Sequence, residues 1–143
     1  MPVNPASPAQ STILVVEPDI LVRIAIADYL RECGYKVLEG VAAEEAVTVL
    51  ESKQKIDIVF AEVQLSGDMD GFALAQWIRK NHSGVNVLLT SGIPKAAEKA
   101  GDLCDESPLE KPYHPHDLVR RINLLLERRR TALAGKPEHG CGT

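Results

Sequence analysis

The most constraining feature of this chain is a short apolar run that ends on a carboxylate and passes directly into a loop rich in glycine and aspartate. The run covers residues 57–62, in the order Asp-Ile-Val-Phe-Ala-Glu, and the loop continues to Gly71. A run of this length with almost no polar interruption is typical of a strand buried on both faces, as in a parallel sheet. Glu62 then lies at the C-terminal end of its strand, the edge at which open α/β sheets build their sites.

Segments typical of strands and of helices alternate along the rest of the chain. Runs of apolar residues predict four further strands, at residues 13–16, 35–39, 85–90 and 109–111. Apolar residues at helical spacing predict five helices, at residues 20–33, 43–52, 71–81, 94–100 and 116–130. Strands that alternate with helices in this way predict an α/β fold, in which helices cover both faces of a parallel sheet.

The two ends of the chain differ from the segment between them. Residues 1–11 contain three prolines, and residues 131–143 contain three glycines and one proline. Such segments bury too little apolar surface to offset the entropy of ordering them. We therefore expect a disordered lead over residues 1–11, one domain over residues 12–130 and a flexible tail over residues 131–143.

Charge and cysteine content narrow the class of protein. The formal net charge of −4 argues against direct nucleic-acid binding, which favours a basic face. The three cysteines are widely spaced and odd in number, so they fit neither a disulfide framework nor a CxxC metal site, and free thiols indicate a reducing compartment. No apolar run approaches the roughly 18 residues of a membrane span, and the N-terminal residues lack the pattern of a signal peptide. We expect a cytoplasmic protein without membrane contact.

Polar residues stand at four of the predicted strand ends. They are Glu17, Glu62, Thr90 with Ser91, and Lys111. Parallel strands bring their C-terminal ends to one edge of the sheet, so these side chains are expected to meet there. Carboxylates hold a hard cation, while a hydroxyl and an ammonium neutralise the oxygens of a phosphoryl group. The combination predicts a site for a cation and a phosphoryl group.

The order of these residues resembles that of the receiver domains of bacterial two-component response regulators. The matching segments are 13–17, Arg23, 34–35, 57–60, 69–72, 89–92 and 110–113. The resemblance implies a receiver domain over residues 12–130 with a flavodoxin-like (βα)5 fold, a doubly wound parallel sheet of strand order 2-1-3-4-5. It also implies a sensor histidine kinase or another signalling protein as partner. A homodimer is a further expectation, through the face formed by the fourth helix, the fifth strand and the fifth helix.

In that family, an aspartate at the end of the third strand accepts a phosphoryl group, and an acidic pair after the first strand holds Mg²⁺. The resemblance places Glu62 at the phosphoacceptor position. It also places Glu17, Glu62 and the main chain of Gln64 at the metal ion. Around the phosphoryl group it places Thr90, Ser91 and Lys111. An aromatic residue of the fifth strand usually swings inward as the switch.

The chain departs from this pattern at three positions. Glu62 replaces the aspartate, Pro18 replaces the second metal-binding acid, and Pro108 stands where the switch aromatic is expected. The extra methylene of Glu62 moves its carboxylate by roughly 1.5 Å, enough to disturb in-line attack, which is sensitive to about 1 Å. Because Pro18 carries no carboxylate, any Mg²⁺ binding is expected to be weak. We expect Glu62 to form an ion pair with Lys111 and to mimic the phosphoryl charge in part.

Simpler interpretations of the same residues stay open at this stage. Glu62 and Lys111 also fit solvated surface residues, and Glu17 fits a cap of the following helix. Asp19 is better suited to capping that helix than to binding a metal ion. The arginines at 128–130 suit the C-terminal end of a helix, where positive charge is favourable, better than a nucleic-acid contact.

The sequence therefore predicts a stand-alone receiver-like protein that is not an enzyme and acts by protein–protein contact, independently of phosphorylation. The alternative is a phosphoacceptor or phosphate sink that uses a non-standard residue, although Asp68 and Asp70 lie past the strand end, in the loop. A nucleotide-binding enzyme is disfavoured because residues 17–20 contain no glycine for a phosphate-binding loop. Residues 93–108, with few apolar contacts expected, should be the most mobile part of the fold.

Overall fold

The computed structural model describes residues 11–91, 109–111 and 113–133. The strands are β1 (Thr12–Val16), β2 (Lys36–Gly40), β3 (Ile58–Glu62), β4 (Asn86–Ser91) and β5 (Leu109–Glu110). The helices are α1 (Ile20–Glu32), α2 (Ala43–Glu51), α3 (Gly71–Asn81) and α5 (Pro115–Leu133). These elements alternate as predicted, and the helix predicted over residues 94–100 lies outside the described residues.

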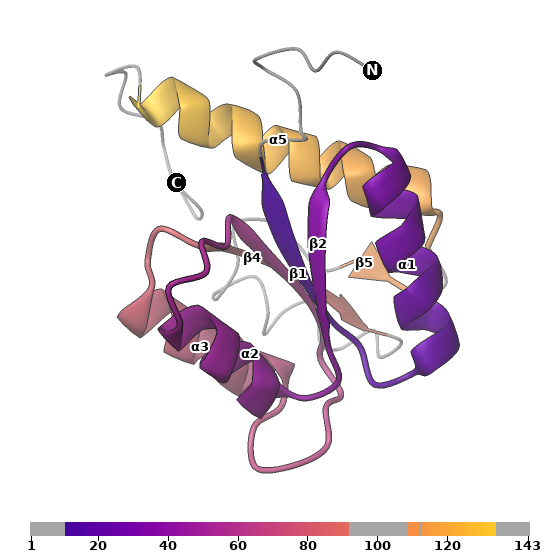
Figure 1. Cartoon of the computed structure of the whole chain (residues 1–143), viewed down its shortest axis with the longest axis vertical. Helices are drawn as coiled ribbons and strands as arrows, with labels where there is room; N and C mark the ends of the chain where they lie inside the picture. The colour runs from indigo at the N-terminus through magenta and orange to yellow at the C-terminus, as the bar shows by residue number, and fades with distance from the viewer. Residues whose placement is uncertain (1–10, 92–108, 112, 134–143) are drawn as a thin grey trace.

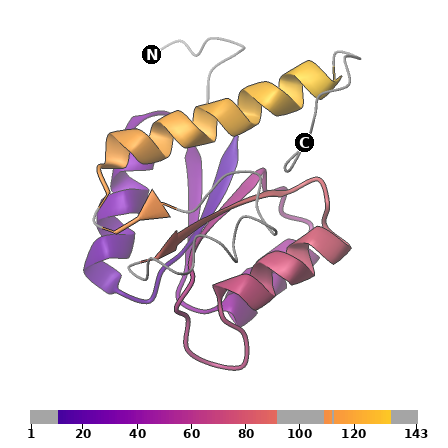
Figure 2. The ribbon, with the colours of Figure 1, turned by 180° about the vertical axis from the view of Figure 1, so that it is seen from behind.

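The strands form one parallel sheet of order β2-β1-β3-β4-β5, which confirms the predicted flavodoxin-like topology (Figure 1). α1 and α5 cover one face of the sheet, and α2 and α3 cover the other, as the view from behind also shows (Figure 2). The chain starts at β1, moves outward to β2 and returns to β3 on the other side of β1. This reversal makes a topological switch point between β1 and β3, where open α/β sheets place their sites.

The central strands contribute side chains to two apolar layers. Ile13 and Val15 of β1 pack with the buried faces of α1 and α5. Leu14 and Val16 point the other way, toward α2 and α3. Every residue of β1 and of β3 is buried. Burial on both faces explains why these strands are continuous apolar runs in the sequence, and each fully buried Ile, Leu or Val side chain contributes about 1.5–3 kcal/mol of transfer free energy.

Aspartates begin the two helices that follow the acidic strand ends. Oδ1 of Asp19 accepts hydrogen bonds from the backbone N–H of Leu21 at 3.0 Å and of Val22 at 3.2 Å, so Asp19 is the predicted N-cap of α1. Asp70 caps α3 in the same way and accepts from the N–H of Ala73 at 2.8 Å. Both caps satisfy N–H groups that the helices themselves leave without partners.

Glycine is required where α3 meets the end of β3. The N–H of Gly71 donates to the carbonyl oxygen of Val63 at 2.8 Å. A Cβ atom at position 71 would lie only 2.5 Å from the carbonyl oxygen of Glu62. Gly71 thereby allows the chain to turn back directly behind Glu62. Gly34, shortly after the end of α1, has a φ of 102°, a conformation that glycine adopts without strain.

Two predicted boundaries differ from the structure. α5 begins at Pro115, where a proline is favourable in the first helical turn, and it continues to Leu133. Residues 131–133 are therefore helical and do not belong to a flexible tail, because no glycine or proline interrupts the sequence before Gly135. At the other end, Ser11 already belongs to the fold, since its carbonyl oxygen accepts a hydrogen bond from β2 at 3.0 Å.

Several predictions concern parts of the chain outside the described residues. They are the disordered lead over residues 1–10, the tail over residues 134–143, the mobile segment over residues 93–108 with Pro108, and the dimer face to which the fourth helix would contribute. Within the described part of the chain, none of the helices is both long and apolar enough to cross a membrane.

Candidate functional site

The predicted site residues converge at the C-terminal edge of the sheet. Glu62 and Ser91 end β3 and β4, Thr90 precedes Ser91, Glu17 follows β1, and Lys111 follows β5. The strand register places Glu62 directly beside Thr90. Glu17 and Glu62 are only 5% and 6% exposed, and the two hydroxyl side chains are also buried. The edge is therefore an enclosed polar cluster, and Glu62 is not a solvated strand end.

Lys111 joins the two acids of this cluster. Its Nζ donates to Oε1 of Glu62 at 2.8 Å and to Oε1 of Glu17 at 3.0 Å. The first contact confirms the predicted ion pair and excludes the interpretation of Lys111 as an unpaired surface lysine. The second contact is not expected from the sequence, because the family pattern assigns Glu17 to a metal ion. One ammonium thus bridges residues that are far apart in the sequence.

The ammonium of Lys111 stays charged at neutral pH. Burial alone lowers the pKa of Lys111, but the hydrogen bonds and charges of Glu62 and Glu17 outweigh burial and raise it above its ordinary value of 10.5. Two carboxylates and one ammonium leave a formal excess of one negative charge. Oε2 of Glu62 is buried and accepts no hydrogen bond from the described residues. A buried acceptor without a partner costs about 1–3 kcal/mol of stability.

Glu17 is held from four directions. Its N–H donates to the carbonyl oxygen of Gly40 at 3.0 Å, and its own carbonyl oxygen accepts from Nη1 of Arg23 at 2.8 Å. Oε2 accepts from the N–H of Asp19 at 3.0 Å, and Oε1 accepts from Lys111. Glu17 therefore stabilises the turn before α1, while Asp19 caps the helix, so the interpretation of Glu17 as the helix cap is wrong.

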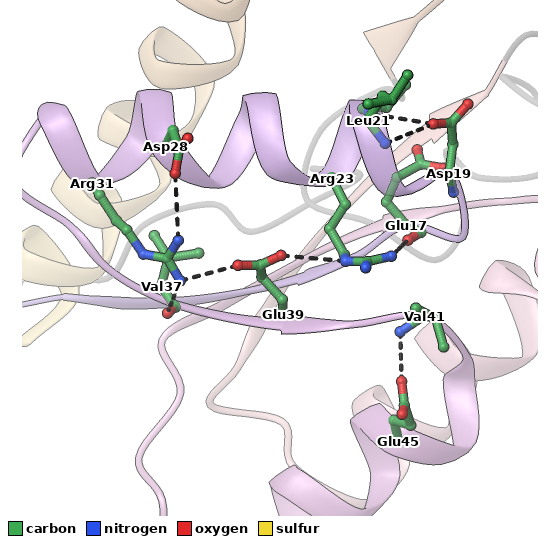
Figure 3. A network of polar contacts seen from close by, with 11 residues as sticks. Glu17, Asp19, Leu21, Arg23, Asp28, Arg31, Val37, Glu39, Val41 and Glu45 are labelled. Carbon is green, nitrogen blue, oxygen red and sulfur yellow. Dashed lines mark hydrogen bonds and ion pairs between the residues drawn. The ribbon is translucent and has the colours of Figure 1, made fainter.

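Arg23 connects this turn to the edge strand β2 (Figure 3). Its Nε lies 3.3 Å from Oε1 of Glu39, and the other oxygen of Glu39 lies 3.2 Å from Nη2 of Arg31. Arg31 also donates to the carbonyl oxygen of Val37 at 3.0 Å and pairs with Asp28 at 3.7 Å. The Arg23 side chain is only 13% exposed, so this network is a fixed support of the Glu17 turn. In the sequence, Arg23 stands out only as part of the family pattern.

Tyr113 borders the cluster on the side of α5. Its ring packs edge-on against Phe60 of β3, with ring centroids 5.9 Å apart and an interplanar angle of 86°. Burial raises the pKa of Tyr113, and the negative charges of Glu17 and Glu62 raise it further. Its hydroxyl group is buried and has no hydrogen-bond partner among the described residues. In the sequence, Tyr113 stands out only as part of the matching segment 110–113, as an aromatic residue directly after the Lys-Pro pair, and it is not among the predicted site residues.

The strand order and the polar cluster together point to one family. Residues 13–123 match the family model of the response regulator receiver domain. The chain belongs to this family. Its receiver domain is therefore a component of two-component signalling, and the placement of Glu62 at the phosphoacceptor position stays a prediction.

Individual relatives agree with this assignment. The receiver domain is 33% identical over 128 residues to the transcriptional regulatory protein PdtaR of Mycobacterium tuberculosis (strain CDC 1551 / Oshkosh), covering 87% of this chain and 62% of that protein. It is 28% identical over 118 residues to the probable transcriptional regulator ycf27 of Cyanophora paradoxa, covering 81% of this chain and 48% of that protein. The chain thus spans about half to three fifths of the length of these relatives.

Solved structures show the same fold. A CheY-like response regulator receiver domain protein from Methanospirillum hungatei JF-1 superposes with a TM-score of 0.78 at 21% sequence identity, covering 85% of this chain and 98% of that chain. At this level of identity, the similarity supports the fold alone.

The cluster does not fit the divalent metal ion that the family implies. Mg²⁺ requires oxygen ligands at about 2.0–2.1 Å in near-octahedral geometry. Here Oε1 of both acids contacts Lys111, and Oε2 of Glu17 accepts from Asp19. Pro18 offers no side-chain oxygen, and among the described residues no three His, Cys, Asp or Glu side chains form a group suited to a metal ion. A metal contact of the Gln64 main chain stays a prediction.

Proposed function

We propose that this receiver domain signals without being phosphorylated, through direct contact with a sensor histidine kinase or another signalling protein. The ion pair between Glu62 and Lys111 carries the proposal. The carboxylate at the phosphoacceptor position is already bonded, at 2.8 Å, to the lysine that the family pattern assigns to the phosphoryl group. The site therefore holds Lys111 without any phosphoryl group.

Three features oppose phosphoryl transfer to Glu62. The extra methylene shifts the carboxylate by roughly 1.5 Å from the place that an aspartate would occupy. The carboxylate is also engaged by Lys111 and nearly closed to solvent. Finally, the cluster does not fit the metal ion that neutralises an incoming phosphoryl group. The alternative acceptors are no better placed, because Asp70 caps α3 and Asp68 is exposed in the loop.

The same arrangement supports a binding role and not catalytic turnover. A general base or a nucleophile needs an atom that a substrate can reach. Both carboxylate oxygens of Glu17 and Oε1 of Glu62 have partners within the chain, and Oε2 of Glu62 is buried. We therefore propose that the chain is not an enzyme.

The first two turns of α1 offer a surface for a protein partner. Ile20, Leu21 and Ile24 are 57%, 77% and 44% exposed, next to the turn that carries Glu17. Three segments that follow strands at this edge and include the first residues of α1 and α2, residues 18–21, 41–45 and 64–70, contain five carboxylates and no cation: Asp19, Glu44, Glu45, Asp68 and Asp70. An apolar patch beside an acidic edge favours a partner segment that is apolar and basic, and it disfavours nucleic acid and anionic membranes.

Intact-mass measurement after incubation with acetyl phosphate and Mg²⁺ tests the absence of phosphorylation. We expect no gain of one phosphoryl group in the wild-type protein or in Glu62→Gln. A gain in the wild-type protein that is lost in Glu62→Gln overturns the proposal. A gain in both proteins that is lost in Asp68→Asn overturns it as well, in favour of a phosphoacceptor in the loop.

Binding to a panel of purified sensor histidine kinases, measured by fluorescence anisotropy, tests the surface. The double variant Leu21→Ser, Ile24→Ser should weaken binding to the cognate kinase at least about tenfold, since each of the two substitutions removes an apolar anchor. Leu124→Ser is the matched control, because Leu124 is also exposed, at 43%, but belongs to α5 and not to the α1 surface. Equal effects of the double variant and of the control contradict the assignment of the α1 surface.

A further inference from the structure

We propose that the ammonium of Lys111 is the resident cation of the acidic pair and that it excludes divalent metal ions from Glu17 and Glu62. The exclusion follows from the geometry of the three side chains. Its meaning for regulation rests on the proposed function, because it explains how the site is kept in one state without a phosphoryl group.

The ammonium occupies the space between the two carboxylates. Nζ lies 2.8 Å from Oε1 of Glu62 and 3.0 Å from Oε1 of Glu17. A metal ion that contacts both oxygens, at about 2.0–2.1 Å for Mg²⁺, fills the same space. Metal ion and ammonium therefore compete for one position. A metal ion that enters while Lys111 is in place also meets a positive charge at short range in a site that is largely closed to water.

The acidic pair itself remains suited to a cation once the ammonium is removed. Glu62 is 6% exposed, and its Oε2 accepts no hydrogen bond from the described residues, so one buried oxygen is free to act as a ligand. Glu17 keeps its direction without Lys111, because Arg23 holds its carbonyl oxygen at 2.8 Å and the N–H of Asp19 holds its Oε2 at 3.0 Å. The main barrier to a metal ion is therefore the lysine, and the loss of an acid at position 18 is secondary.

Because the ammonium of Lys111 is part of the chain, it links elements of the fold and stays tethered at the acids, unlike a bound metal ion. Lys111 lies between β5 and α5, so its two ion pairs join this part of the chain to the ends of β1 and β3. The ammonium cannot diffuse away, and its effective concentration at the acids does not depend on the metal content of the solution. The site therefore keeps the same state until a divalent ion is concentrated enough to displace the ammonium.

Titration of the protein with Mn²⁺ tests this inference. Calorimetry measures the heat of binding, and electron paramagnetic resonance measures the concentration of free Mn²⁺. Lys111→Met should show saturable binding to one site, with a dissociation constant at least about ten times lower than that of the wild-type protein. Adding Glu62→Gln to Lys111→Met should abolish that site. Lys55→Met is the matched control, since Lys55 is 82% exposed and lies 4.0 Å from Asp57, and it should behave like the wild type.

The Pro18→Asp variant tests whether it is Lys111 or the missing acid at position 18 that prevents metal binding. With Lys111 in place, this variant should bind Mn²⁺ no better than the wild type. Tight binding by the wild type or by Pro18→Asp, equal to that of Lys111→Met, overturns the inference. Weak binding by Lys111→Met, with native circular dichroism, overturns it too. If Lys111→Met does not fold, the wild type and Pro18→Asp decide alone: tight binding by either refutes the exclusion, and weak binding by both supports it.

The outcome is independent of the test of the proposed function. Mn²⁺ binding is measured without a phosphodonor, whereas phosphorylation is read as an intact-mass gain. A phosphorylated protein that still excludes Mn²⁺ refutes only the proposed function. An unphosphorylated protein that binds Mn²⁺ tightly refutes only the role of Lys111 as the resident cation.

Discussion

Replacing Lys111 by methionine is expected to destabilise the fold more than replacing Glu62 by glutamine, although both changes remove the same 2.8 Å ion pair. Lys111→Met keeps the aliphatic part of the side chain but leaves two carboxylates, 5% and 6% exposed, without their cation. Glu62→Gln keeps the shape of the side chain, removes the excess negative charge and leaves Lys111 paired with Glu17 at 3.0 Å. The two variants therefore differ mainly in the charge that stays behind.

The magnitude follows from the burial of the three groups. Removing one partner of a buried ion pair costs about 3–5 kcal/mol, because the remaining charge is buried without compensation. The Lys111 side chain is 28% exposed, and solvent screening lowers this cost, so we expect a loss of about 2–4 kcal/mol for Lys111→Met. Glu62→Gln loses a charge-assisted hydrogen bond but relieves the repulsion between the carboxylates, so we expect a loss of only about 0–1.5 kcal/mol.

Urea unfolding at pH 7, followed by circular dichroism, measures both free energies of unfolding. Linear extrapolation resolves a difference of this size between variants that share the same m-value. Lys55→Met is again the control, and its free energy of unfolding should lie within about 0.5 kcal/mol of the wild type, because Lys55 is 82% exposed and its contact with Asp57 is long, at 4.0 Å.

The opposite order of the two variants contradicts this reasoning. If Glu62→Gln loses as much free energy of unfolding as Lys111→Met, or more, then uncompensated charge does not determine the stability of the cluster. The contribution of Lys111 would then come from its packing and its hydrogen-bond geometry.

Three further predictions follow from the described contacts. Asp19→Ala should lower the free energy of unfolding by about 1 kcal/mol, measured by urea unfolding, because α1 loses its N-cap; an unchanged value means that water replaces the cap fully. Gly71→Ala should lower the free energy of unfolding by about 1–3 kcal/mol, because the new Cβ would lie 2.5 Å from the carbonyl oxygen of Glu62. Gly84→Ala is the control, since a Cβ at position 84 would have nothing within 4 Å. Similar unfolding midpoints for the two variants refute the close approach. Burial raises the pKa of Tyr35 from 10.0 to about 12, so its contribution to stability is complete below pH 10 and is lost as the pH rises toward about 12. Thermal unfolding of Tyr35→Phe should therefore depend less on pH over this window than that of the wild type, and identical pH profiles count against the buried phenol.

The sequence by itself determined the elements and their order. Strands buried on both faces must be continuous apolar runs, so residues 13–16 and 57–62 were recognisable as central strands. Helix starts depend on neighbours within a few residues, which is why Asp19 is recognisable from the sequence as the cap of α1. Alternation of the elements left few topologies, and the family resemblance selected the observed strand order.

The sequence also predicted the edge of the sheet at which the site residues lie. Parallel strands have their C-terminal ends at one edge, so the meeting of Glu17, Glu62 and Lys111 needed only the order of the elements. The ion pair between Glu62 and Lys111 followed from the added reach of the longer acid. What this logic leaves open is which oxygen of which acid each donor contacts.

Only the tertiary structure decided how the charges are shared. Lys111 contacts Glu17 across 94 residues of sequence, and Tyr35 donates to Asn123 across 88 residues. Such contacts depend on side-chain directions and on distances of a few ångströms between elements, and neither leaves a periodic trace in the sequence. The sequence therefore shows that acids and a lysine meet, whereas packing of the layers decides that the lysine takes the position between both acids and leaves one buried oxygen of Glu62 without a partner.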